Sequence, residues 1–310
     1  MSLEPTDDDP LVRQGRPAAE LLRIHRATGA GTDCSHGSGF YLNLKACALQ
    51  PCELDAVFSL EGVSELGLSG NPSLGMSGAI KIAEALSNGW DARLYGVYVS
   101  RCNLSSDGGL AIARALSNSS TSKVARVGLN TNGLEDSAAI HFAPLLRQRS
   151  LLALGLSDNA IGDQAASAIA EALYANETLQ RLFLNYNTIT CIGALAFARL
   201  LLSGKAKMLR RLGLAHNMID EAGGSALAAG ALAASDTLEL ICLFGNPFLS
   251  AADDFAQYGA LAARHRLSQL LNVNLNGLSV VRIADGTDHY FYHSDTLEKD
   301  RFRDISDSVG

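Results

Sequence analysis

Hydrophobic residues recur along this chain in a frame of eleven positions. The clearest copy runs from Leu179 to Ile189, with leucine at its first, fourth and sixth positions, asparagine at the ninth and an aliphatic residue at the eleventh. The ninth positions of seven successive copies are Asn71, Cys102, Asn132, Asn159, Asn187, Asn217 and Asn246. The copies are therefore spaced 27 to 31 residues apart, a period typical of a solenoid of stacked repeats.

The centre of each frame predicts a short β-strand. Its leucines alternate with other residues, so the leucines point inward and the residues between them point outward. The ninth-position asparagine carries two donor hydrogens and an acceptor, and we expect it to satisfy backbone groups where the chain leaves the strand. Cysteine at Cys102 and Cys47 fits the same position as a small side chain that is easily buried.

A helical segment follows most frames. Apolar residues recur at three- and four-residue steps in segments 78–86, 110–116, 165–173 and 194–201, which is typical of amphipathic helices. Aspartates, which can cap the free N–H groups of a helix, stand before several of them: Asp107, Asp136, Asp163 and Asp220. Pro144 should divide the helical segment around it into two short pieces.

Alternating strands and helices predict an α/β fold. We expect a right-handed solenoid shaped as a horseshoe, with a parallel β-sheet on the concave face and helices on the convex face. The frame resembles the leucine-rich repeats of the ribonuclease-inhibitor-like subfamily over residues 39–278. The wider family includes ribonuclease inhibitor, activators of Ran-type GTPases, sensor domains of NOD-like receptors and axonemal or other cytoskeletal components. The resemblance implies protein binding on the concave face or the rims.

Three segments are predicted. Residues 1–38 hold an acidic tail, a capping helix at 17–26 and a glycine-rich linker. Residues 39–278 hold about seven regular repeats, with degenerate copies at 42–49 and 270–278 and a last helix at 253–264. Residues 279–310 hold a β-hairpin around Asp285 and Gly286, followed by a charged tail. We interpret the hairpin as a cap that pairs with the last strand; an aromatic edge strand offered to a partner is the alternative.

Composition narrows the class of partner. The 310 residues carry a net charge of −7, which argues against nucleic acid or an anionic membrane. No apolar run reaches the ~18 residues of a spanning helix, and the acidic start is unlike a secretory signal. We therefore expect a cytoplasmic protein with reduced cysteines. The resemblance adds a cytoskeletal, axonemal or flagellar assembly as one setting.

No residue pattern indicates catalysis, a metal or a cofactor. The sequence lacks the motifs of serine hydrolases, zinc proteases, phosphate-binding loops and calcium-binding loops. The spacing of Cys34, His36, Cys47 and Cys52 fits no structural zinc site. The sequence predicts neither an enzyme nor a bound cofactor.

The third, fifth, seventh and eighth positions of each frame should face the concave surface. They supply the candidate partner-binding residues Tyr98, Arg101, Arg126, Arg181, Phe183, Tyr186, Arg211, His216 and Phe244. Aromatic side chains that project beside arginines match the composition of protein-binding hot spots. The alternative is that these aromatics are isolated surface residues without a role.

Three functions follow. The first is a non-enzymatic interaction scaffold or complex subunit that binds a protein on the concave face. The second is a regulator of a small GTPase resembling the Ran activators, for which Arg101 is the nearest rim candidate. The third is a ribonuclease-inhibitor-like blocker, but that inhibitor is rich in cysteine and strongly acidic, unlike a chain with six cysteines and a net charge of −7.

Overall fold

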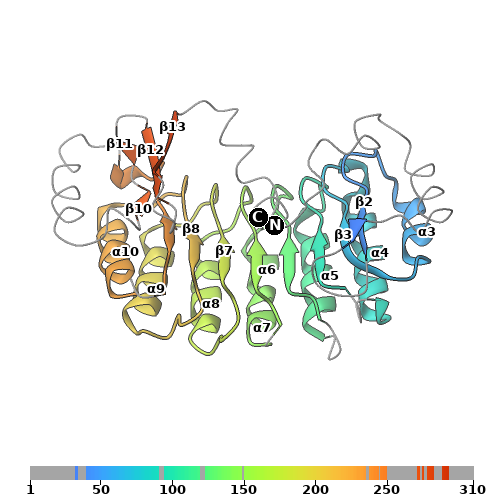
Figure 1. The fold of residues 1–310 in the computed structure, drawn as a ribbon, viewed down its shortest axis with the longest axis horizontal. Coiled ribbons are helices and arrows are strands. Elements are labelled where there is room, and N and C mark those ends of the chain that lie inside the picture. The colour runs from blue at the N-terminus through green and yellow to red at the C-terminus, as the bar shows by residue number, and fades with distance from the viewer. Residues whose placement is uncertain are drawn as a thin grey trace. The chain divides into compact units, whose positions relative to one another are not determined.

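The structure is a computed structural model whose elements are shown in Figure 1. It describes residues 40–90, 94–118, 123–148, 150–234, 237–243 and 245–249, together with the backbone of short strands at 32–33 and within 271–292. The predicted helices at 17–26 and 253–264 and the tail from residue 297 lie outside these ranges. The chain forms two units, described in turn: β1 to β6 belong to the first, and β7 to β13 to the second.

The first unit is built on a parallel sheet. Its strands β2 to β6 lie side by side in chain order, and β1 joins β2 in the antiparallel direction. The strands are β1 (Thr32–Asp33), β2 (Phe40–Asn43), β3 (Val63–Gly67), β4 (Gly96–Tyr98), β5 (Arg126–Gly128) and β6 (Ala153–Gly155). Strand β1 lies within the predicted glycine-rich linker and extends the edge of the sheet by pairing with Tyr41 and Phe40.

Helices connect the strands of the first unit and pack against one another (Figure 1). They are the 3-10 helix η1 (Pro51–Glu53), α3 (Leu54–Phe58), η2 (Pro72–Leu74), α4 (Gly75–Ser87), α5 (Ser105–Asn118), α6 (Asp136–Ala139), η4 (Ile140–Phe142) and α7 (Ala143–Leu146), which extends to the boundary of the unit. Pro144 is the second residue of α7, where a missing N–H costs nothing. The predicted division of this helix is confirmed.

The second unit repeats the same plan. Strands β7 (Arg181–Phe183), β8 (Arg211–Gly213), β9 (Leu240–Cys242) and β10 (Leu271–Asn272) pair in parallel and in chain order. Helices α8 (Asp163–Leu173), α9 (Cys191–Leu202) and α10 (Glu221–Ala233) pack in sequence, and the 3-10 helix η5 (Pro247–Leu249) follows β9. The α/β solenoid predicted from the frame is confirmed.

The predicted C-terminal hairpin is formed by β12 and β13. Strands β11 (Asn274–Leu275), β12 (Leu278–Arg282) and β13 (Asp288–Tyr292) make a separate antiparallel sheet, with Val280 opposite Tyr290. The hairpin joins the chain before it through β12, which pairs with β11 inside the predicted last repeat. Strand β10 forms the edge of the parallel sheet, with Leu271 opposite Ile241. The predicted copy at 270–278 would place Val273, two residues later, opposite Ile241.

Asparagines hold the turn after most of the described strands, as predicted. The side chain of Asn217 is a typical case: its amide donates to the carbonyls of Leu184 and Leu214 at 2.9 and 3.0 Å, and its carbonyl accepts from the Ile189 N–H at 3.1 Å. Cys102, at the same frame position, donates its thiol to the Leu68 carbonyl at 3.1 Å. These side chains pair backbone groups that would otherwise be buried without partners.

The capping aspartates follow the prediction only in part. Asp220 accepts the N–H of Gly223 at 3.0 Å and caps its own helix α10. Asp107 and Asp136 lie within the first turns of α5 and α6, where a negative charge interacts favourably with the positive end of the helix dipole. Asp163 bonds to the helix that follows its own. No helix within the described ranges is long and apolar enough to cross a bilayer.

Candidate functional site

Each of the parallel strands β2 to β9 is followed by a residue with left-handed backbone geometry at the eighth position of the frame. These residues are Ala46, Gly70, Arg101, Thr131, Asp158, Tyr186, His216 and Gly245, with φ between 51° and 76°. Residues other than glycine adopt this region at a cost. The repeated turn therefore fixes where the eighth side chains point, and these include Arg101, Tyr186 and His216.

The seventh positions that the structure describes between Ser69 and Ala215 are buried, so the expectation that they line an open surface was wrong there. In the first unit, the Ser69 hydroxyl accepts the N–H of Ser100 at 3.2 Å, and the Ser100 hydroxyl accepts the N–H of Asn130 at 3.1 Å. In the second unit, the Asn185 carbonyl accepts the N–H of Ala215 at 2.9 Å. These side chains join neighbouring repeats, because each satisfies a backbone donor of the next one.

We call the side of the parallel strands opposite the helices the sheet face; the third and fifth frame positions lie on it. Tyr98 occupies a fifth position in the first unit, but it is only 1% exposed. Its ring lies along its own strand over Gly96, where an added Cβ would stand 2.8 Å from the phenol oxygen. Tyr41 meets it edge-on, with ring centroids 6.3 Å apart. The expected projecting ring was therefore wrong at Tyr98.

Arg126 is also held within the first unit. Its guanidinium lies 3.7 Å from the carboxylate of Glu65 and stands over the ring of Tyr95 at 5.0 Å. Glu65, Gly96 and Arg126 occupy the same frame position on three adjacent strands, and the glycine between the charges lets them meet. Sequence reasoning missed Glu65, although reading the third position two repeats before Arg126 would have found it.

The Tyr98 hydroxyl completes this cluster. It donates to the Glu65 carboxylate at 3.1 Å. Burial, and next the negative charge of Glu65, raise the pKa of Tyr98 well above its usual value, while Arg126 opposes the shift. The cluster is thus a buried polar and aromatic network in which the described groups satisfy one another. Arg101 lies apart from this network and is exposed.

The second unit places three of the candidate residues side by side on β7 and β8. Arg181 and Arg211 are directly opposite on β7 and β8, and Phe183 lies opposite Gly213. Both arginines and Phe183 are half-buried. The amide of Asn185 occupies the space over Gly213. Arg211 has no carboxylate partner in the part of the chain that the structure describes.

Tyr186 and His216 form a stack at the ends of the same two strands. Their ring centroids are 4.2 Å apart and the planes differ by 10°. Both residues are half-buried and left-handed, which presents the two rings as one surface. His216 also fills the space over Gly245. The ninth candidate, Phe244, lies outside the described residues.

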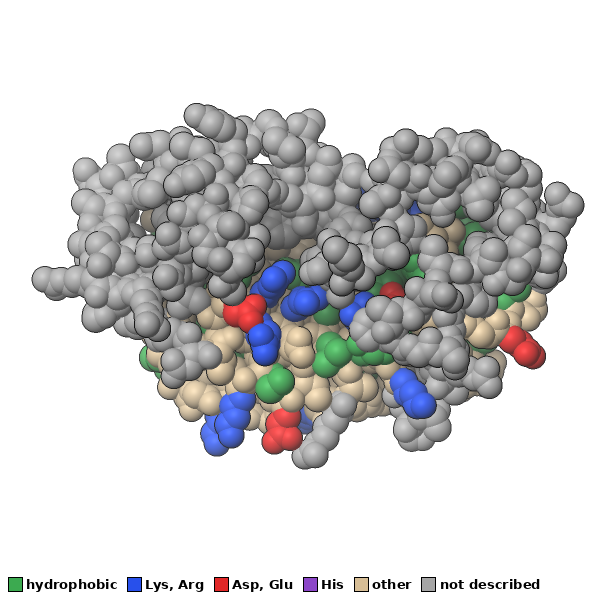
Figure 2. All heavy atoms as spheres, viewed as in Figure 1, with side chains coloured by type: hydrophobic (Ala, Val, Ile, Leu, Met, Phe, Trp, Pro, Cys, Tyr) green, Lys and Arg blue, Asp and Glu red, His purple; other side chains and the backbone are tan. Residues whose placement is uncertain are grey.

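Positive charge gathers near the centre of the face in Figure 2, where Lys and Arg side chains are drawn in blue. A further ion pair joins Arg210 to Glu239 at 2.6 Å. These two residues follow the first positions of neighbouring frames, a relationship readable from the sequence but not considered. Arg210 is thereby neutralised, which distinguishes it from Arg211.

No metal centre is found among the described residues. Five cysteines there are free thiols: Cys47, Cys52, Cys102, Cys191 and Cys242. Burial, and next the charge of Glu53, raise the pKa of Cys47 to about 11, so its thiol is protonated near neutral pH. Cys34 and His36 lie outside the described residues.

Comparisons with known proteins found one family model and several solved structures. No curated protein matches the chain. Among solved structures, the actin-binding site 2 of leiomodin-1 is 20% identical, covering 59% of this chain and 95% of that one, with a TM-score of 0.40. The plant peptide hormone receptor RGFR1 in complex with RGF2 is 14% identical, covering 62% and 37%, with a TM-score of 0.30. A family model described as a leucine-rich repeat matches residues 147–170, which hold part of one predicted repeat.

Proposed function

We propose that this protein is a non-enzymatic interaction scaffold that binds a protein partner on the sheet face of its second unit. The observation that carries the proposal is the pairing of Arg181 with Arg211 beside Phe183. Half-buried arginine and aromatic side chains combine contact area with directional hydrogen bonds, the composition of hot spots. Leucine-rich repeats support this reading, since stacked repeats provide extended binding surfaces.

The charge of this surface indicates the chemistry of the partner. The third and fifth positions of β7 to β9 hold Arg181, Phe183, Arg211, Gly213, Leu240 and Cys242. These positions supply cations and apolar groups but no carboxylate. Because guanidinium groups bind carboxylates through paired hydrogen bonds, we infer that the partner presents Asp or Glu side chains beside an apolar group.

The Tyr186–His216 stack extends the same surface toward the ends of the strands. Its two rings offer rigid area, and stacking leaves few rotamers to be lost on binding. Tyr98 and Arg126, by contrast, are buried in the first unit and already have partners. The proposed binding surface is therefore narrower than the residue set predicted from the sequence.

An affinity purification from native cells tests the proposal. The wild type is compared with Arg181→Glu combined with Phe183→Ala, and with the control Arg199→Glu on the exposed side of α9. We expect the double variant alone to lose one set of partners while all three proteins keep the same melting temperature. Retention of every partner by the double variant would show that the sheet face of the second unit is not the binding surface.

A regulator of a small GTPase is the second candidate. Arg101 supports it as an exposed guanidinium on a turn whose left-handed geometry fixes its direction. The discriminating measurement is GTP hydrolysis by a Ran-type GTPase with wild-type protein and with Arg101→Ala. Acceleration that Arg101→Ala abolishes would favour the regulator, whereas unchanged hydrolysis would leave the scaffold.

The five free thiols support a reducing, cytoplasmic setting.

A further inference from the structure

Helix α4 has a second face that the core does not use. Its buried residues are Gly78, Ala79, Ile82, Ala83 and Leu86. Lys81, Glu84, Ala85 and Asn88 recur at three- and four-residue steps and therefore share a different face of the helix. All four line a hollow of about 450 Å³ between α3 and α4, within the range of small-ligand pockets. We call it the α3–α4 hollow.

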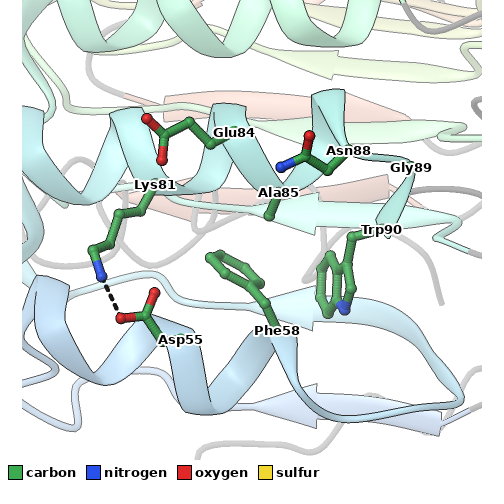
Figure 3. Close-up of a pocket in the computed structure, with 8 residues that line it drawn as sticks. All are labelled: Asp55, Phe58, Lys81, Glu84, Ala85, Asn88, Gly89 and Trp90. Atoms are coloured by element: carbon green, nitrogen blue, oxygen red, sulfur yellow. Dashed lines mark hydrogen bonds and ion pairs between the residues drawn. The ribbon is translucent and has the colours of Figure 1, made fainter.

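Two aromatic rings line the α3–α4 hollow. Phe58 ends α3 and Trp90 follows α4, and their ring centroids are 5.0 Å apart with planes at 67°. Figure 3 shows both rings in the space between the two helices. Both residues are only half-buried. The hollow therefore offers π-electron surface to a ligand, and an aromatic face attracts cations.

The charges around the hollow do not balance. Lys81 pairs with Asp55 at 2.5 Å, one helix to the next. Glu84 is exposed and has no cationic partner in the described part of the chain. In Figure 3 its side chain extends along α4 toward Lys81. Glu84 lines the hollow together with the two aromatic rings. One carboxylate remains for a ligand after the lysine is paired.

We propose that the α3–α4 hollow binds an arginine side chain of a partner protein. A guanidinium is planar, stacks on aromatic rings and donates two parallel hydrogen bonds to a carboxylate. An anion would meet Glu84 and a lysine that is already paired, and a purely apolar ligand would leave Glu84 unused. This site lies on α3 and α4 and involves no residue of the proposed partner surface on β7 to β9, so the two proposals stand or fall separately.

The test uses the intrinsic fluorescence of Trp90, the only tryptophan of the chain. The full protein is titrated with N-acetyl-arginine amide and with N-acetyl-citrulline amide, a neutral analogue of similar shape. We expect a saturable change with the arginine compound, with a dissociation constant on the order of millimolar because the probe is small and the site open. The citrulline compound should bind roughly fivefold more weakly, because it lacks the charge that the ring faces and Glu84 attract.

Variants separate specific binding from general quenching. Glu84→Gln should weaken binding of the arginine compound about fivefold, a modest factor because the carboxylate is exposed. The matched control Glu61→Gln removes another exposed carboxylate of the same unit and should leave binding unchanged. Phe58→Leu should also weaken binding. Should Phe58→Leu fail to fold, Glu84→Gln decides alone, since an exposed side chain contributes little to stability.

Several outcomes would overturn the proposal. A fluorescence change that rises without saturation, or equally in Glu84→Gln, shows collisional quenching. Equal binding of the citrulline compound shows an apolar pocket. Tighter binding of N-acetyl-lysine amide, or of N-acetyl-aspartate amide, shows that the site is not built for a guanidinium. The partner surface is unaffected by any of these results.

Discussion

The carboxylate of Asp163 caps the helix of the following repeat through Thr190. One oxygen accepts the Thr190 N–H at 2.8 Å and the N–H of Gly193 at 2.9 Å, and the other accepts the Thr190 hydroxyl at 2.6 Å. Asp163 begins α8, whereas Thr190 precedes α9. One aspartate thus satisfies donors at the start of a neighbouring helix, which joins two repeats.

Asp163→Ala should lower the free energy of unfolding by ~2 kcal/mol, because three donors lose a charged acceptor. Denaturant titration provides the measurement. Asp107→Ala is the control: Asp107 lies in the first turn of α5, and the loss there should be ~0.5 kcal/mol. Equal losses in the two variants would mean that the bonds between repeats add nothing beyond the helix dipole.

Asn217→Ala should lower the free energy of unfolding by ~3 kcal/mol, because the Ile189 N–H and the Leu184 carbonyl remain buried without that partner. The neighbouring Met218 is 58% exposed, and Met218→Ala should change stability by less than ~0.5 kcal/mol. Thermal and denaturant unfolding measure both. A small effect of Asn217→Ala would show that water replaces the asparagine in the turn.

Ala46→Gly should stabilise the protein by ~0.5 kcal/mol. Ala46 is exposed with φ of 53°, and glycine removes the steric cost of that geometry at some expense in unfolded-state entropy. In α4, Ala85→Gly should do the opposite and destabilise by ~1 kcal/mol. Destabilisation by both glycines would contradict a strained left-handed turn at Ala46.

Tyr98 makes stability depend on alkaline pH. Its folded-state pKa is raised above the value of about 10 that applies to an unfolded chain, so the folded state holds the proton more tightly. The stability that the protonated Tyr98 contributes is fully present below pH ~10. The free energy of unfolding should fall as pH rises above that value.

Tyr98→Phe should remove this alkaline loss while costing ~1 kcal/mol at neutral pH through the bond to Glu65. Denaturant unfolding at pH 8 and pH 10.5 measures the difference. Tyr174→Phe, at a residue that is 40% exposed, serves as the control and should keep the wild-type slope. If the free energy of unfolding of Tyr98→Phe fell between pH 8 and pH 10.5 as much as that of the wild type, a group other than Tyr98 would cause the alkaline loss.

The repeat plan was predictable because the frame fixes a strand, a turn and a helix through local periodicity. The asparagine at Asn217 and the divided helix at Pro144 follow from side-chain chemistry alone. The register of β10 did not follow, since this degenerate copy offers several leucines and three asparagines, so the frame could be placed on it in more than one way.

The candidate site was only partly predictable. Alternation tells which side of a strand a residue is on, but not how far its side chain stands out. Tyr98 lies flat because Gly96 leaves room beneath it, and Arg126 reaches Glu65 across the same glycine. The Phe58–Trp90 pair joins segments from two repeats outside the eleven-residue frame, so the strand pattern carried no sign of it.

The asparagine turns also impose an order on biosynthesis. The N–H at the end of one turn bonds to the asparagine of the next repeat, 28 residues later for Ile189 and Asn217 and 27 for Ile219 and Asn246. A ribosome releases the donor first and its acceptor only after most of another repeat. During synthesis, the hydrogen bond that completes each of these turns can therefore form only after the asparagine of the next repeat has left the ribosome.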